Sequence, residues 1–221
     1  MNQKEMTPSE NVSAKSYDSP PWWYDIRGFF ILTFAYNDTL WRQVHFFSKN
    51  VSDNHLEAAV GTGSLLAIVM KYLKWIKGRK PKNVIAIDYA DDMLKGAQKK
   101  LKNLNIKVNM GDLTNIGFNT EQFDSINLAN SFHTIKDIQL ALAEIYRVLK
   151  INGLFCGNVL LPPKKGPFGW LSSRVNSWGK KKGILYRPYK KDEVIMLLAN
   201  QGFKVIYDFE VGNAYYFRAQ K

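Results

Sequence analysis

The sequence of 221 residues contains one cysteine, Cys156, and only three histidines. A single thiol excludes an intramolecular disulfide framework and a zinc site built from several thiolates. The histidines, at positions 45, 55 and 133, lack the spacing of metal ligands, so no metal is expected. The most apolar early stretch, residues 29–36, is far shorter than the roughly 20 residues that span a bilayer. The polar segment 1–20 lacks the apolar core of an export signal, so a cytoplasmic location is expected.

Acidic residues are outnumbered, since 31 Lys and Arg stand against 19 Asp and Glu and give a formal net charge of +12. Such a protein is attracted to anionic surfaces. Most of the excess comes from residues 161–191, which mix lysines and arginines with Trp, Tyr and Phe and contain no acidic residue. A solvated loop rarely contains two tryptophans, so this basic aromatic insertion is expected to pack on a substrate or on a bilayer interface.

Short apolar runs alternate with helical periodicity along most of the chain. The pattern predicts strands over 55–60, 83–88, 106–110, 123–129, 154–160, 203–210 and 214–219, and helices over 64–77, 91–104, 137–149 and 191–200. This alternation indicates an α/β fold, a Rossmann-like doubly wound sheet that is mostly parallel. Only three residues join the last two strands, which permits only antiparallel pairing, so one strand near the C-terminus is reversed. One or two further helices are predicted over 22–47, ahead of the sheet.

A glycine turn follows the first predicted strand, at Gly61, Thr62 and Gly63, and leads into a helix. Glycine lets a backbone turn tightly and approach a ligand closely. Asp88 ends the second strand at a spacing that suits ribose hydroxyls, and Asp112 follows the third, where a carboxylate can accept from an adenine amine. Because these positions meet at one edge of a parallel sheet, the pattern indicates an adenosine-containing ligand.

Charge argues for a cationic ligand. A dinucleotide fingerprint would place a third glycine at position 66, where this chain has Leu66. Glu57, just before the turn, would repel a phosphate and attract an ammonium or sulfonium group.

The chain resembles class I S-adenosylmethionine-dependent methyltransferases of the small-molecule type, from about residue 55 to the C-terminus. Five segments carry the resemblance in family order: 55–63 (HLEAAVGTG), 86–94 (AIDYADDML), 111–113 (GDL), 123–130 (FDSINLAN) and 143–150 (AEIYRVLK). The last segment is also similar to that of quinone-biosynthesis C-methyltransferases. The resemblance divides the chain into a polar tail with cap helices, residues 1–50, and a methyltransferase domain, residues 51–221.

The resemblance implies S-adenosyl-L-methionine as cofactor, S-adenosyl-L-homocysteine as product, and a role for each matching residue. The glycine turn would pack under the methionine part, Glu57 would hold its amino group, and Asp88 would bind the ribose. Asp112 would accept from the adenine amine, between Tyr89 and Leu113. The other expected cofactor contacts are Ala59, Met93, Gly111, Ala129 and Asn130. Ala129, Asn130 and His133 would border the transferring methyl, and His133 and Tyr24 are the candidate proton acceptors.

Two positions depart from the family pattern. Ala59 stands where glycine is common, and residues 151–153 (ING) replace a proline-glycine-glycine sequence. The additional methyl group of Ala59 keeps open the alternative of a non-catalytic protein that binds S-adenosylmethionine or a nucleotide. A further alternative, an NAD-dependent dehydrogenase, conflicts with Glu57.

The acceptor is expected to be small and either aromatic or lipid-like, because aromatic residues are dense over 22–41. An RNA methyltransferase is the alternative, but residues 130–133 (NSFH) lack the run expected of an adenine amino-group enzyme. Cys156 is also badly placed for cytosine chemistry and reads as an inert buried thiol. The expected protein is a monomer or homodimer that acts on a small molecule and not on nucleic acid. Three readings of residues 161–191 stay open: contact with anionic lipid at the inner face of a membrane, a lid over the acceptor, and binding of RNA or DNA phosphates with aromatic stacking.

Overall fold

A computed structural model describes residues 28, 31–164, 169–181 and 185–221. Its centre is a seven-stranded sheet with the strand order β3-β2-β1-β4-β5-β7-β6. The strands are β1 (Asn54–Ala58), β2 (Asn83–Asp88), β3 (Ile106–Met110), β4 (Phe123–Leu128), β5 (Leu149–Leu160), β6 (Lys204–Val211) and β7 (Ala214–Gln220). The order reverses between β1 and β4, and in open α/β sheets such a switch point lies beside the ligand site.

The first five strands are parallel and the last pair is not. β7 runs antiparallel to both of its neighbours, β5 and β6, so it is the one reversed strand and lies next to the edge of the sheet. This confirms the prediction from the short connection between the last two strands. The β5 prediction began too late, because pairing with β4 already starts at Leu149 and an irregularity around Asn152, with φ of 63°, interrupts the register.

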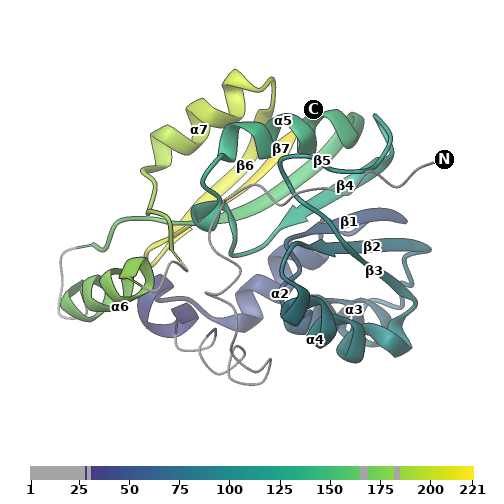
Figure 1. Cartoon of the computed structure of the whole chain (residues 1–221), viewed down its shortest axis with the longest axis horizontal. Coiled ribbons are helices and arrows are strands. Elements are labelled where there is room, and N and C mark those ends of the chain that lie inside the picture. Colours follow the sequence, from purple (N-terminus) through teal and green to yellow (C-terminus); the bar gives the residue numbers. More distant parts are fainter. Residues whose placement is uncertain (1–27, 29–30, 165–168, 182–184) are drawn as a thin grey trace.

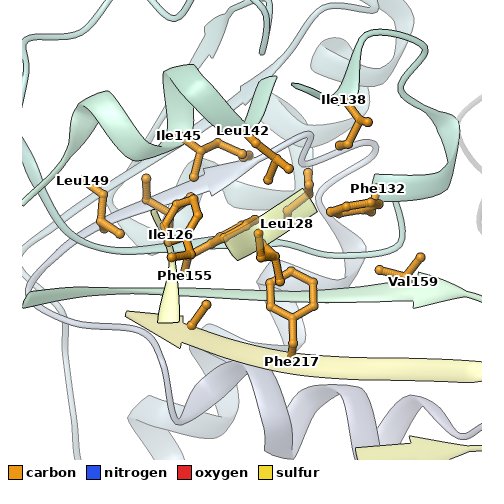
Figure 2. Packing of buried hydrophobic residues seen from close by; sticks show 14 of the residues in the cluster. Ile126, Leu128, Phe132, Ile138, Leu142, Ile145, Leu149, Phe155, Val159 and Phe217 are labelled. Carbon is orange, nitrogen blue, oxygen red and sulfur yellow. The ribbon is translucent and has the colours of Figure 1, made fainter. Parts of the chain in front are cut away.

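Helices cover both faces of the sheet (Figure 1). The helices of the described residues are η2 (Ile31–Tyr36), α2 (Leu40–Ser48), α3 (Ser64–Trp75), α4 (Asp91–Leu101), η3 (Lys102–Leu104), η4 (Phe132–Thr134), α5 (Ile138–Val148), α6 (Gly169–Lys181) and α7 (Lys191–Asn200). Successive strand residues point to opposite faces. Thus Phe155 packs with α5 and α7 in one core, part of which Figure 2 shows, while Cys156 packs with α2 and α3 in the other.

The segment ahead of the sheet contains two helical pieces within the described residues, as predicted. The π-helix η2 and the α-helix α2 are joined by a short connection, and the Thr39 side chain caps α2 by accepting from the Arg42 N–H. The β6–β7 turn packs against this connection, since the Asn213 N–H donates to the Tyr36 carbonyl at 2.8 Å. The C-terminal hairpin therefore holds the N-terminal helices in place.

The basic aromatic insertion contains a helix that the sequence pattern did not predict. Residues 169–181 form α6, which packs on η2. One of its faces buries Ser172 and Asn176, and the Ser172 hydroxyl accepts from Asn213 Nδ2 of the β6–β7 turn at 3.3 Å. Its opposite face exposes Trp170, Arg174 and Trp178, four residues apart. No helix among the described residues is long and apolar enough to cross a bilayer.

Candidate functional site

The glycine turn joins β1 to α3 at the carboxyl edge of the sheet. Gly61 and Gly63 have φ of 56° and 76°, in the left-handed region that favours glycine. A Cβ on Gly63 would lie 3.1 Å from the Cα of Ala97 in α4, so this glycine also allows the two helices to approach. A Cβ on Gly61 would meet no described atom within 4 Å, which leaves room beside the turn.

Asp88, the last residue of β2, connects the glycine turn to the third strand. Its Oδ2 accepts from the Gly61 N–H at 2.7 Å, and its own backbone carbonyl accepts from the Gly111 N–H at 3.0 Å. The side chain is 7% exposed, and burial raises the pKa of its carboxyl group against the lowering effect of the backbone hydrogen bonds. The structure thus brings together Gly61, Asp88 and Gly111, which the sequence predicted to meet.

Glu57 lies inside β1 and belongs to a buried polar network. Its Oε2 accepts from Asn127 Nδ2 of β4 at 3.2 Å and lies 3.4 Å from His55 Nε2. Asn127 in turn accepts from Asn50 Nδ2 at 2.9 Å, so the segment after α2 also supports Glu57. Among the described residues, no lysine or arginine forms a salt bridge with Glu57 or Asp88. Two buried carboxyl groups therefore lie near this edge without a lysine or arginine partner, although Glu57 lies beside His55.

The residues predicted around the adenine lie after β2 and β3. Asp112 Oδ1 accepts from both the N–H and the hydroxyl of Thr114 at 2.8 Å, which fixes the turn that follows Gly111. Tyr89 is exposed and Leu113 half-buried, whereas Met93 is buried in the first turn of α4. These side chains surround the ends of two neighbouring strands, as adjacent parallel pairing requires.

Asn130 follows β4 and ties the N-terminal helices to the sheet. Its φ is 57°, and its amide pairs reciprocally with that of Gln43 in α2 at 2.8 and 3.0 Å. Asn158 of β5 accepts from the Asn130 N–H at 2.6 Å and donates to its Oδ1 at 2.7 Å. Sequence patterns did not identify Gln43 or Asn158, because these partners of Asn130 lie far from it along the chain. Ala129, beside Asn130, is half-buried.

His133 lies in η4 and is buried against Tyr36. The tyrosine hydroxyl is 3.0 Å from Nε2 and 3.3 Å from Nδ1, and the rings meet edge to face. Burial lowers the pKa of His133 to about 3, so its imidazole is neutral at pH 7 and a weak base. This geometry favours a packing role over proton abstraction. Tyr24, the other predicted proton acceptor, lies outside the described residues.

Cys156 faces the core on the α2 side of the sheet and is fully buried. Burial raises the pKa of its thiol to about 12, so no thiolate forms near neutral pH. In the described part of the chain, no group of three His, Cys, Asp or Glu side chains could hold a metal ion.

Comparisons with known proteins show which proteins this chain is similar to. Residues 56–157 match the family model described as a methyltransferase domain. A demethylmenaquinone methyltransferase from Thermus thermophilus is 31% identical over 137 residues, which cover 60% of this chain and 59% of that protein. One from Thermotoga maritima is 26% identical over 197 residues, which cover 80% and 82%. The chain spans between 30% and 59% of the length of the first three curated relatives.

The fold also matches solved structures. A SAM-dependent methyltransferase from Thermotoga maritima, described as a possible histamine N-methyltransferase, superposes with a TM-score of 0.64 at 18% identity, covering 91% of this chain and 97% of that one. The strand order is that of the solved methyltransferase fold, and the chain is similar to class I S-adenosylmethionine-dependent methyltransferases in its matched segment and in the order of its motifs.

Proposed function

We propose that the chain transfers the methyl group of S-adenosyl-L-methionine to a small aromatic or lipid-like acceptor. The observation that carries this proposal is the carboxyl edge of the sheet, where Asp88 joins the Gly61 turn to Gly111. Neither buried carboxyl group pairs with a lysine or arginine among the described residues. This suits a ligand that brings positive charge, because buried negative charge is costly to leave uncompensated. A pyrophosphate would be repelled by the same groups.

The proposed cofactor contacts follow the three strand ends. The Gly61 turn would carry the methionine part and Glu57 would bind its ammonium group. Asp88 would accept from the ribose hydroxyls. Its Oδ2 accepts from the Gly61 N–H at 2.7 Å and its Oδ1 from the Ala90 N–H at 3.0 Å, and each carboxylate oxygen can accept a second hydrogen bond. The remaining proposed contacts are Ala59, Thr62, Gly63, Tyr89, Met93, Gly111, Asp112, Leu113, Ala129 and Asn130.

When bound, the cofactor supplies an electrophilic methyl group, which bonds to an electron pair of the acceptor as the carbon–sulfur bond breaks and S-adenosyl-L-homocysteine is left. The chain contributes mainly alignment and exclusion of water. Asn130 is suited to border the reacting atoms, because Gln43 and Asn158 fix its side chain from two elements. An acceptor that must lose a proton needs a base. His133 is unsuited to that role because its ring is buried and its pKa is lowered to about 3, so water or another group would take the proton.

A quinone-type acceptor is supported by the names of several relatives, which are demethylmenaquinone methyltransferases. The division into cap residues 1–50 and domain 51–221, and a monomeric or dimeric state, remain predictions. Peripheral contact with the inner face of a membrane through residues 161–191 is supported by α6, which exposes Trp170, Arg174 and Trp178 on one face.

Asp88→Ala tests the cofactor site. We expect calorimetric titration of the variant with S-adenosyl-L-methionine to show at least about a 100-fold loss of affinity, since hydrogen bonds to a charged group contribute about 1.5–3 kcal/mol each. Asp124→Ala is the matched control, because it removes a carboxylate at the opposite end of β4, where Asp124 pairs with Lys150. The control should bind as the wild type does.

The same titration separates the alternatives. Binding of NAD in place of S-adenosyl-L-methionine, or unchanged affinity in Asp88→Ala, would contradict the proposal. Tight cofactor binding with no methyl transfer to any demethylquinone or phenolic acceptor, followed by mass spectrometry, would favour a non-catalytic binding protein.

A further inference from the structure

An exposed aromatic and basic surface covers α2 and the C-terminal half of α3, on the far side from the sheet. Trp41 is 63% exposed, Trp75 73% and Ile76 66%. Ile68, Tyr72 and Ile76 recur every four residues along α3, and the Trp41 ring packs edge to face on Tyr72 at 5.4 Å. We call this the α2–α3 surface; its apolar members are Leu40, Trp41, Ile68, Trp75 and Ile76.

Positive charge surrounds these side chains. Residues 71–82 contain six lysines and arginines, and no acidic residue occurs between Ser64 and Asn83. Lys74 Nζ lies 4.7 Å from the centre of the Trp75 ring, and Lys77 Nζ lies 5.8 Å from that of Tyr72. A basic run at the end of a helix is by itself typical of a solvated surface. The structure shows instead that the lysines border a set of exposed tryptophan and isoleucine side chains.

We propose that the α2–α3 surface binds the headgroup region of an anionic lipid membrane. Tryptophan and isoleucine side chains partition into that region, and each nearby lysine is attracted by the negative surface potential. This surface is separate from α6 and does not depend on methyl transfer. It would hold the protein at a membrane by two elements, and lasting attachment generally needs more than one signal.

Two other occupants fit less well. A second copy of the chain on a two-fold axis would bring identical lysines together, which repels. An RNA strand would stack its bases on aromatic faces, but Lys74 and Lys77 already lie over two of the rings, and Ile68 and Ile76 offer a base neither stacking nor hydrogen bonds.

Cosedimentation of the full chain with vesicles tests the proposal. We expect binding to vesicles of phosphatidylcholine containing about one-third phosphatidylglycerol, little binding to phosphatidylcholine alone, and a decrease as salt is added. Trp75→Ala should weaken binding at least about tenfold, because the exposed ring loses its apolar contact, while Trp75→Phe should retain most of it. Lys74→Gln with Lys77→Gln should weaken binding about 25-fold, at about fivefold for each lysine.

The matched control is Lys102→Gln with Lys107→Gln, which removes the same charge from exposed positions on η3 and β3. We expect it to weaken binding no more than about threefold, through net charge alone. Equal losses in both pairs, or unchanged binding in Trp75→Ala, would overturn the proposal. The proposal would also be overturned if these variants of the α2–α3 surface bound vesicles normally but lost binding to an RNA oligonucleotide. The same holds if they bound vesicles normally but dissociated a dimer in sedimentation equilibrium.

Failure here can be told apart from failure of the methyl-transfer proposal. Trp75 lies eleven residues after Ser64, about 16 Å along the helix from the glycine turn, so Trp75→Ala should bind S-adenosyl-L-methionine as the wild type does. Normal cofactor binding with no vesicle binding would contradict only the proposal that the α2–α3 surface binds a membrane. Vesicle binding that depends on Trp170 but not on Trp75 would assign the membrane contact to α6 alone and overturn this inference.

Discussion

Ala59, between β1 and the glycine turn, has φ of 56°, a conformation that costs a residue with a Cβ about 1–2 kcal/mol. Ala59→Gly should therefore raise the free energy of unfolding by about 0.5–1 kcal/mol, after the greater flexibility of glycine in the unfolded chain is subtracted. Urea denaturation measures this change. Ala58→Gly, in the fully buried end of β1, is the control and should destabilise the protein. A destabilised Ala59→Gly would mean that the Ala59 methyl makes contacts worth more than the strain.

His133 makes stability depend on pH. Burial holds its folded-state pKa at about 3, against 6.5 for a free histidine, so the unfolded chain binds a proton between these values that the folded chain does not. Stability contributed by the neutral ring is full above pH 6.5 and falls as the pH drops toward 3. Between pH 7 and pH 5 the loss is about 2 kcal/mol.

His133→Gln should remove that part of the pH dependence, measured as the difference in unfolding free energy between pH 7 and pH 5 for each protein. His45→Gln is the control, because His45 is exposed on α2. If the wild type and His133→Gln lose stability in parallel, the ring titrates normally and is not buried as described.

At the scale of single residues, the sequence predicted where a side chain lies in the sheet better than it predicted the hydrogen-bond partners of that side chain. Asp88 was identified by its place at the end of β2, because parallel strand ends meet at one edge. Gln43, Asn158 and Tyr36 were not identified, because an isolated amide or phenol carries no signal until folding brings its partner to it. Burial, which decides the basicity of His133, is also a property of the folded chain alone.

Among the elements, the β6–β7 turn lies in close contact with the η2–α2 connection. Gly212 has φ of 53°, and a Cβ there would lie 2.4 Å from the carbonyl oxygens of Tyr36 and Asn37. Gly212→Ala should lower the unfolding free energy by about 2–4 kcal/mol, since both the backbone conformation and the clash oppose it. Denaturant unfolding measures this loss.

Gly78→Ala provides the matched control for that substitution. Gly78 has φ of 62°, but a Cβ there meets no described atom within 4 Å, so it should cost only the conformational part, about 1–2 kcal/mol. Equal costs at the two glycines would show that the hairpin and the N-terminal helices can separate freely.

Hydrophobic periodicity predicted the regular elements well, and β2, β3 and α7 have the predicted bounds. α6 was missed because its glycines, serines and lysines have no strong helical pattern. Its packing on η2 and the hydrogen bond of Ser172 with Asn213 are contacts distant in sequence. The early start of β5 was missed because Asn152 and Gly153 read as a turn, whereas they form an irregularity within the strand.

For the whole molecule, the alternation of strands and helices was enough to predict a doubly wound sheet, and the short final connection predicted its reversed strand. The α2–α3 surface could be identified only from the structure. The apolar residues of these helices include both buried and exposed ones, and the sequence does not show which are exposed. The sequence assigned most of the positive excess to residues 161–191 and predicted a membrane contact there, but it did not single out the α2–α3 surface.

The burial of Cys156 has a consequence for following how this protein opens. The thiol is the only one in the sequence, lies in β5 beside Arg218, and is protonated near neutral pH. Alkylating reagents need both access and a thiolate, and the native state supplies neither. The rate of alkylation therefore measures how often the middle of the sheet separates from α2 and α3. No engineered cysteine is needed, and no second thiol reacts.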